Sequence, residues 1–113
     1  MSQIVLSQAV AASTESTYNV KAPFSGLIKD VTIHWPSGCN GLVDVAFGYG
    51  SIQLTPRTGY IALSAVTPKW DTDDKHWVKI RELLWLKVRN TDAANSHTIT
   101  AVVTIEPRYE EPK

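Results

Sequence analysis

Apolar and polar residues alternate along most of this chain, which is the pattern of half-buried β-strands. The clearest case is the segment of residues 97–106, where Ile99, Ala101, Val103 and Ile105 fall on one face. Its β-branched residues, and the Gly and Pro residues that recur between the segments, disfavour helices. The pattern therefore predicts a small antiparallel β domain.

Turn signals divide the chain into about eight such strands, at the ~8–12-residue spacing typical of sandwiches and barrels. The predicted strands cover residues 17–22, 27–35, 42–49, 51–54, 60–66, 77–80, 83–89 and 97–106, and the segments 77–80 and 83–89 form either two strands or one bent strand. In the second of these, Leu27, Val31, Ile33 and Trp35 are expected on one face together with Lys29. In the third, the buried row is expected to be Val43, Val45, Phe47 and Tyr49.

Three segments are expected outside the regular strands. Residues 1–16 mix apolar residues with Ser, Thr and Gln, which indicates an N-terminal arm or an edge strand. Residues 68–75 are polar and predict a long exposed loop. The sandwich domain is expected to cover residues 17–107, and residues 108–113 to form a flexible tail.

Length and charge limit the classes of function. At 113 residues the chain is long enough for one domain with one core. Its 11 basic and 11 acidic residues cancel, so there is no overall field to attract nucleic acid or an anionic membrane. Residues 1–12 show neither a basic leader nor a sustained apolar run, so no signal peptide or membrane span is predicted. The single cysteine, Cys39, cannot form a disulfide within the chain.

No spacing of residues predicts a catalytic site or a bound cofactor. The donor types of a blue-copper site are present in His34, Cys39, His76 and His97. In cupredoxins, however, the Cys lies near the C-terminal end and is followed shortly by His and Met, whereas here Cys39 lies in the first half of the chain and the only Met is Met1. No Gly-x-Ser-x-Gly elbow is present. Basic residues flank Trp77 and Trp85 as in single-strand nucleic-acid binders, but Glu82 dilutes them, and solvent-facing strand residues are the preferred interpretation.

The polar stretch could hold a cation. Asp71, Asp73 and Asp74 offer oxygen ligands for calcium but lack the spaced Gly and terminal Glu of an EF-hand loop. A solvated acidic turn is therefore the preferred interpretation.

Four tryptophans are many for so small a core. Trp35 and Trp85 lie in predicted strands and are expected to be packed. Trp70 and Trp77 flank the polar stretch, where each is either exposed or folded back over the core. An exposed ring can stack on a sugar or anchor a protein interface.

The order of three segments resembles the small jelly-roll proteins of tailed-virus particles, including capsid decoration and head or tail accessory proteins. These segments are GLIKDVTIHWPSG at residues 26–38, LLWLKVRNTD at residues 83–92 and HTIT at residues 97–100. The resemblance implies a β-sandwich of jelly-roll type and a structural role in a symmetric assembly. It carries over no functional residue.

The function expected from this resemblance is that of a non-enzymatic virion protein, made in the host cytoplasm, which forms homo-oligomers and docks on coat subunits. The alternative is a carbohydrate-binding module that stacks a glycan on Trp70, Trp77 or Tyr49, with calcium at residues 71–74. An enzyme with a cupin-like metal site is the third hypothesis, and it lacks clustered ligands at a recognisable spacing.

Overall fold

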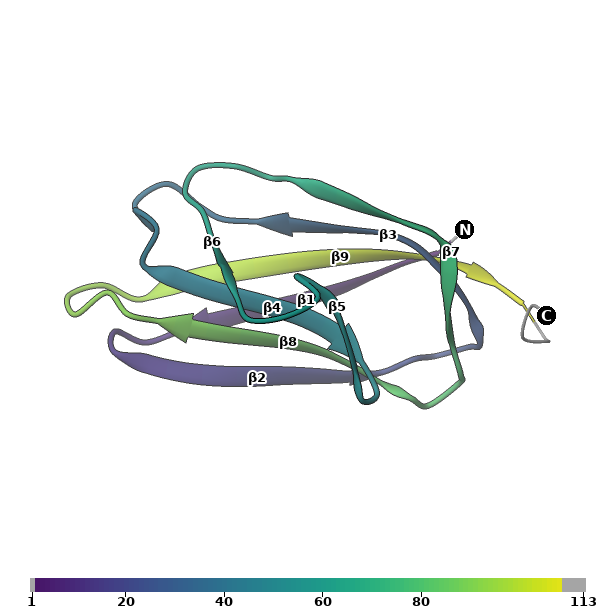
Figure 1. The fold of residues 1–113 in the computed structure, drawn as a ribbon. Coiled ribbons are helices and arrows are strands. Elements are labelled where there is room, and N and C mark those ends of the chain that lie inside the picture. The colour runs from purple at the N-terminus through teal and green to yellow at the C-terminus, as the bar shows by residue number, and fades with distance from the viewer. Residues whose placement is uncertain (1, 109–113) are drawn as a thin grey trace.

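A computed structural model describes residues 2–108 as two antiparallel β-sheets packed face to face (Figure 1). The first sheet contains, in spatial order, β1 (Ser2–Val10), β9 (His97–Pro107), β3 (Gly26–His34) and β7 (Lys69–Val78). The second contains β2 (Thr14–Lys21), β8 (Leu83–Asn90), β4 (Val43–Tyr49) and β5 (Ile52–Thr55), and β6 (Ile61–Ala62) also pairs with β4.

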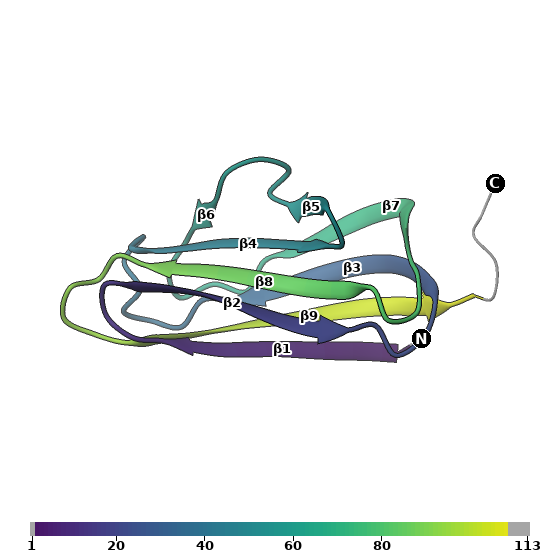
Figure 2. The ribbon, with the colours of Figure 1, turned by 90° about the horizontal axis from the view of Figure 1, so that it is seen from below.

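The strand order is that of a jelly roll. The connections β1–β2, β2–β3 and β3–β4 each cross from one sheet to the other, and so do β6–β7, β7–β8 and β8–β9. The molecule is elongated along the strands, with extents of 47 × 23 × 22 Å (Figure 2). The predicted fold class, a jelly-roll β-sandwich, is confirmed.

Alternate residues of both sheets form the core between them. The predicted row of β4, Val43, Val45, Phe47 and Tyr49, is buried, and so is the row of β9. Trp35 is fully buried, and its indole N–H donates to the carbonyl oxygen of Val43 at 3.1 Å. This bond satisfies a polar group that would otherwise be costly to bury.

The predicted face of residues 27–35 needs one correction. A β-bulge between Ile28 and Asp30 shifts the register of β3 against both of its neighbours. The extra residue places Ile28, and not Leu27 or Lys29, in the core cluster with Val31 and Ile33, although Leu27 is also buried. Alternation alone could not reveal this, because one inserted residue reverses the faces on one side of it.

The predicted exposed loop at residues 68–75 is wrong, because this segment belongs to β7, an edge strand that pairs only with β3. Trp70 packs against the core and Thr72 is buried, with its hydroxyl donating to the carbonyl of Ile28. The charges that indicated a loop instead lie along an edge strand, where charged residues commonly block pairing with other chains.

Two other predicted strands differ in length. The strand expected at residues 60–66 is reduced to β6, followed by an isolated bridge between Val66 and Trp35. The segment of residues 77–89 is two strands, β7 and β8, separated by a turn in which the Glu82 amide donates to the Lys79 carbonyl.

The structure describes part of each predicted terminal segment, residues 1–16 and residues 108–113. Residues 2–16 contain β1, which pairs with β9 over its whole length, and the first residues of β2. In the tail expected at residues 108–113, only Arg108 lies within the described residues, and its amide donates to the Ser25 carbonyl.

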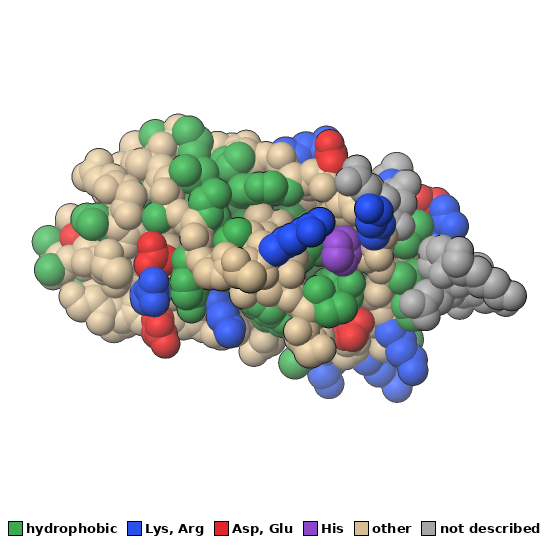
Figure 3. Space-filling model, in the orientation of Figure 1, with side chains coloured by type: hydrophobic (Ala, Val, Ile, Leu, Met, Phe, Trp, Pro, Cys, Tyr) green, Lys and Arg blue, Asp and Glu red, His purple; other side chains and the backbone are tan. Residues whose placement is uncertain are grey.

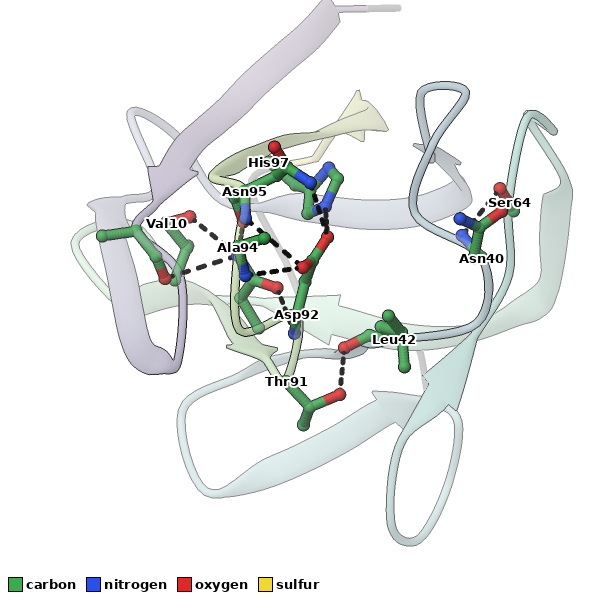
Figure 4. Close-up of polar contacts among 11 residues, drawn as sticks. Val10, Asn40, Leu42, Ser64, Thr91, Asp92, Ala94, Asn95 and His97 are labelled. Carbon is green, nitrogen blue, oxygen red and sulfur yellow. Dashed lines mark hydrogen bonds and ion pairs between the residues drawn. The ribbon is translucent and has the colours of Figure 1, made fainter.

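A polar network joins the loops at one end of the sandwich (Figure 4). The side-chain amide of the buried Asn90 donates to the carbonyls of Val10 at 3.1 Å and Asn95 at 2.9 Å. Asp92 accepts from the Ala94 amide at 2.9 Å and lies 2.8 Å from Nε2 of His97. These bonds tie the loop between β8 and β9 to the end of β1.

The same bonds hold the pKa of Asp92 low. The Ala94 amide, the His97 ring and the Asn95 donors favour the carboxylate and lower the pKa to about 2. The unfolded chain protonates this group near its ordinary value of ~3.9. The stabilisation is therefore complete above about pH 4 and lost as the pH falls towards 2.

We predict that Asp92→Asn lowers the melting temperature at pH 7 by several degrees. The variant should also lose less stability than the wild type between about pH 4 and pH 2, because the carboxylate that titrates there is gone. Thermal unfolding across this range tests the prediction. The control is Asp71→Asn, since the Asp71 side chain is 78% exposed. Parallel curves for wild type and Asp92→Asn would contradict it.

Candidate functional site

The three aromatic residues predicted as alternative stacking surfaces have different surroundings. Tyr49 is 5% exposed, so its ring has no open face. Its hydroxyl lies 2.9 Å from Nδ1 of His76, and the two rings meet edge to face at 5.7 Å between centroids. Tyr49 thus joins β4 in one sheet to β7 in the other.

Trp70 and Trp77 are both half-buried. Trp70 meets Trp35 edge to face, with the ring centroids 6.4 Å apart. The indole nitrogen of Trp77 is buried, and none of the described residues accepts a hydrogen bond from it. Trp70 and His76 line one pocket, whereas Trp77 is not among its lining residues. The three rings thus lie in different surroundings: Tyr49 is buried, whereas Trp70 and Trp77 each keep part of their surface exposed. Stacking of a glycan on either tryptophan stays a prediction.

The pocket beside Trp70 lies between β5 and β7 and has a volume of about 180 Å³. It is lined by Leu54, Thr55, Arg57, Trp70, Asp71, Thr72, Lys75 and His76. Figure 3 shows a histidine side chain beside Lys and Arg side chains on the face where β5 and β7 lie in Figure 1. The pocket therefore brings the cationic groups of Arg57 and Lys75 together with the carboxylate of Asp71.

The electrostatics of this pocket act on His76. Burial of the ring lowers the pKa of His76, and the positive charges of Arg57 and Lys75 lower it further. The ring is therefore held neutral at physiological pH and acts through hydrogen bonds rather than as a cation.

The other donor-type residues are not brought together. His34 bonds the hydroxyl of Thr67, His97 bonds Asp92, and Cys39 is buried. Burial and the nearby Asp92 charge raise the pKa of the Cys39 thiol, which disfavours the reactive thiolate. No group of three His, Cys, Asp or Glu side chains that could hold a metal occurs among the described residues.

The predicted calcium ligands can be followed only in part. The Asp71 carboxylate lies 4.0 Å from the Lys69 ammonium. The side chains of Asp73 and Asp74 lie outside what the structure describes, so calcium binding at residues 71–74 stays a prediction.

A second concave feature lies on the outer face of the second sheet, around Trp85. This outer groove is lined by Thr17, Asn19, Gly50, Ser51, Leu83, Trp85 and Lys87 and has a volume of about 600 Å³. Trp85 was expected to be packed, but it is half-buried on the side of β8 opposite the core residues Leu84 and Leu86.

Alternation along residues 83–89 does place Trp85 opposite the core row. The partners of Trp85 across the sheet, Asn19 and Gly48, come from strands far away in the sequence. The sequence pattern does not predict this groove, because the walls of the groove depend on strand order and register.

Comparison with known proteins gives no relative. No protein-family model, curated protein or solved structure matches this chain. Within the described residues, no helix is long and apolar enough to span a membrane.

We predict that the double variant Arg57→Gln with Lys75→Gln raises the pKa of His76 towards its ordinary value of 6.5. The rise should be partial, because burial is the larger cause and remains. Since the folded state resists protonation of His76, stability falls as the pH drops below about 6.5, and the double variant should lose less of it.

NMR titration of the His76 ring measures this pKa directly. The matched control is Lys79→Gln, which removes an exposed charge at the end of β7. An unchanged His76 pKa in the double variant would show that the two cations do not act on the ring.

Proposed function

We propose that this protein is a non-enzymatic structural or accessory component of a virus particle, which self-associates and docks on coat subunits. The observation that carries the proposal is the free edge of β1. This strand has nine residues, pairs on one side only with β9, and contains neither a charged residue nor a proline. Such an edge is a template for pairing with another chain.

The other edge strands are guarded, and one of them, β6, has only two residues. β7 carries five charged residues, β5 is only four residues long, and β2 has Glu15 near one end and Lys21 at the other. Charge and shortness are the usual means of preventing unwanted strand pairing. Because β1 is neither charged nor short, its edge is favoured as one that pairs with another chain.

The exposed side chains of β1 also favour self-association. Val5 is 56% exposed on the outer face of the first sheet, where it pairs with Val102 of β9. Antiparallel pairing of two β1 strands about a two-fold axis would join two four-stranded sheets into one of eight strands. The chain's zero formal net charge opposes this association less than a large charge would.

The jelly-roll topology and the sequence resemblance support the viral context, because this architecture recurs in capsid domains. The described polar clusters support a structural role, since Asn90 and Asp92 hold loops together through bonds to backbone groups.

We predict that the wild-type chain forms a discrete oligomer and that Val5→Lys weakens its association at least tenfold. Two lysines would approach each other on the same face of a β1–β1 pair, while the exposed site tolerates the longer side chain in the monomer. Sedimentation equilibrium measures the association constant.

The matched control is Thr98→Lys, which adds the same charge at an exposed position of β9, opposite Ala9 and one strand away from the free edge of β1. A wild-type chain that stays monomeric at high concentration, or equal weakening by both variants, would contradict the role of β1.

The viral context has its own test. Particles of the virus to which this proposal assigns the chain are purified by density gradient and analysed by mass spectrometry. We expect the chain at a fixed ratio to the coat protein. Its absence from intact particles would overturn the virion assignment, whatever its oligomeric state.

A further inference from the structure

The indole of Trp85 is held as a platform on the outer face of the second sheet. Its six-membered ring covers the α-carbon of Gly48 on β4, where a Cβ would lie only 2.3 Å from Cζ2 of the ring. The indole N–H donates to the carbonyl oxygen of Gly50 at 3.0 Å. A glycine beneath the ring and a bond at its edge therefore fix the position of this tryptophan.

Polar groups from three parts of the chain surround the ring. Thr17 and Asn19 come from β2, Ser51 from the turn after β4, and Lys87 from β8. Asn19 is directly opposite Trp85 in the strand register. The Lys87 ammonium lies 5.1 Å from the centre of the Trp85 ring. The groove thus combines one aromatic surface with hydroxyl, amide and ammonium groups.

We propose that this outer groove is a saccharide-binding site in which a pyranose ring stacks on Trp85. The C–H groups on one face of a pyranose carry partial positive charge, and the face of an indole is negative. The sugar hydroxyls both donate and accept hydrogen bonds, as do the hydroxyls of Thr17 and Ser51 and the amide of Asn19. The ligand is an oligosaccharide that lies across β2 and β8.

The size and charge of the groove agree with this ligand class. Its volume of about 600 Å³ lies within the ~300–1,000 Å³ of typical small-ligand sites. The exposed Lys87 already interacts with the ring face, and a bound sugar replaces this contact while keeping the ammonium as a donor at its edge. One ammonium and one half-buried indole are a small set for a polynucleotide, which needs a row of cations along its backbone.

This inference goes beyond the proposed virion role and does not depend on it. The groove lies on the outer face of the second sheet, whereas self-association is assigned to an edge of the first. Either can fail while the other holds. The alternative expectation of glycan binding at Tyr49, Trp70 and Trp77 concerns different residues and predicts different variants.

The experiment is an NMR titration of the ¹⁵N-labelled full chain with hexasaccharides of glucose, galactose, mannose, xylose, N-acetylglucosamine and galacturonic acid. The Trp85 indole signal is assigned by its loss in Trp85→Phe. We expect at least one hexasaccharide to shift this signal saturably, while that of the buried Trp35 stays in place. Trp85→Ala should weaken the binding at least tenfold, and Trp85→Phe less, because a flat ring remains.

The matched control is Tyr60→Ala, which removes an exposed aromatic ring outside the groove and should leave the affinity unchanged. If Trp85→Ala does not fold, Asn19→Ala replaces it, since this exposed side chain lines the groove. The proposal is overturned if no hexasaccharide shifts the Trp85 signal, or if binding survives in the groove variants. It is also overturned if a single-stranded oligothymidylate binds at the groove in place of the sugars.

Discussion

A sandwich of two open sheets has four edge strands, and each edge leaves a row of backbone N–H and C=O groups without partners. In this protein, the sequences of the edge strands differ in how they prevent pairing with another chain. The sequence of β7 contains five charged residues, β5 ends after four residues, and β2 has charged residues towards both ends. β1 has none of these features, although it is one of the longer strands. The account of this molecule as an assembling subunit depends on that difference.

The same constraint explains where the sequence pattern misled. Five charged residues and a histidine between Lys69 and Val78 are typical of a loop, yet these residues form an edge strand. Its inward residues are irregular, because Trp70 packs on Trp35 while Thr72 uses its hydroxyl to bond the backbone of β3. A strand that pairs on one side only can be polar on most of its surface, so hydropathy cannot separate it from a loop.

The central strands could be predicted from the sequence because one face of each is buried in the core, which gives a regular alternation of apolar residues. β8 and β9 follow the expected alternation, and the expected row of β4 is buried, although Ala46 and Gly48 on its other face are buried too. What depends on one inserted residue or on strand order could not be predicted. The bulge at Lys29 moved Ile28 into the core, and the pairing of Trp85 with Gly48 created the outer groove. Tyr49 was correctly placed in a strand, but its bond to His76 joins two sheets whose packing the pattern does not specify.

The fold separates two surfaces that the proposals assign to different partners. The free edge of β1 offers backbone groups, which recognise another strand through its main chain and are suited to a second copy. The outer face of the second sheet offers an indole and polar side chains, which recognise a ligand by shape and hydroxyl pattern. A subunit could use both at once, because one surface is an edge and the other is a face.

The most direct test of the central claim is hydrogen–deuterium exchange of the β1 amides at low and high protein concentration. If β1 pairs with β1 of another copy, the amides of Ser2–Val10 that point away from β9 become protected as the concentration rises, while exchange along the edge of β7 does not change. Exchange in β1 that is independent of concentration, in a sample whose mass shows an oligomer, would place the interface elsewhere and contradict the account.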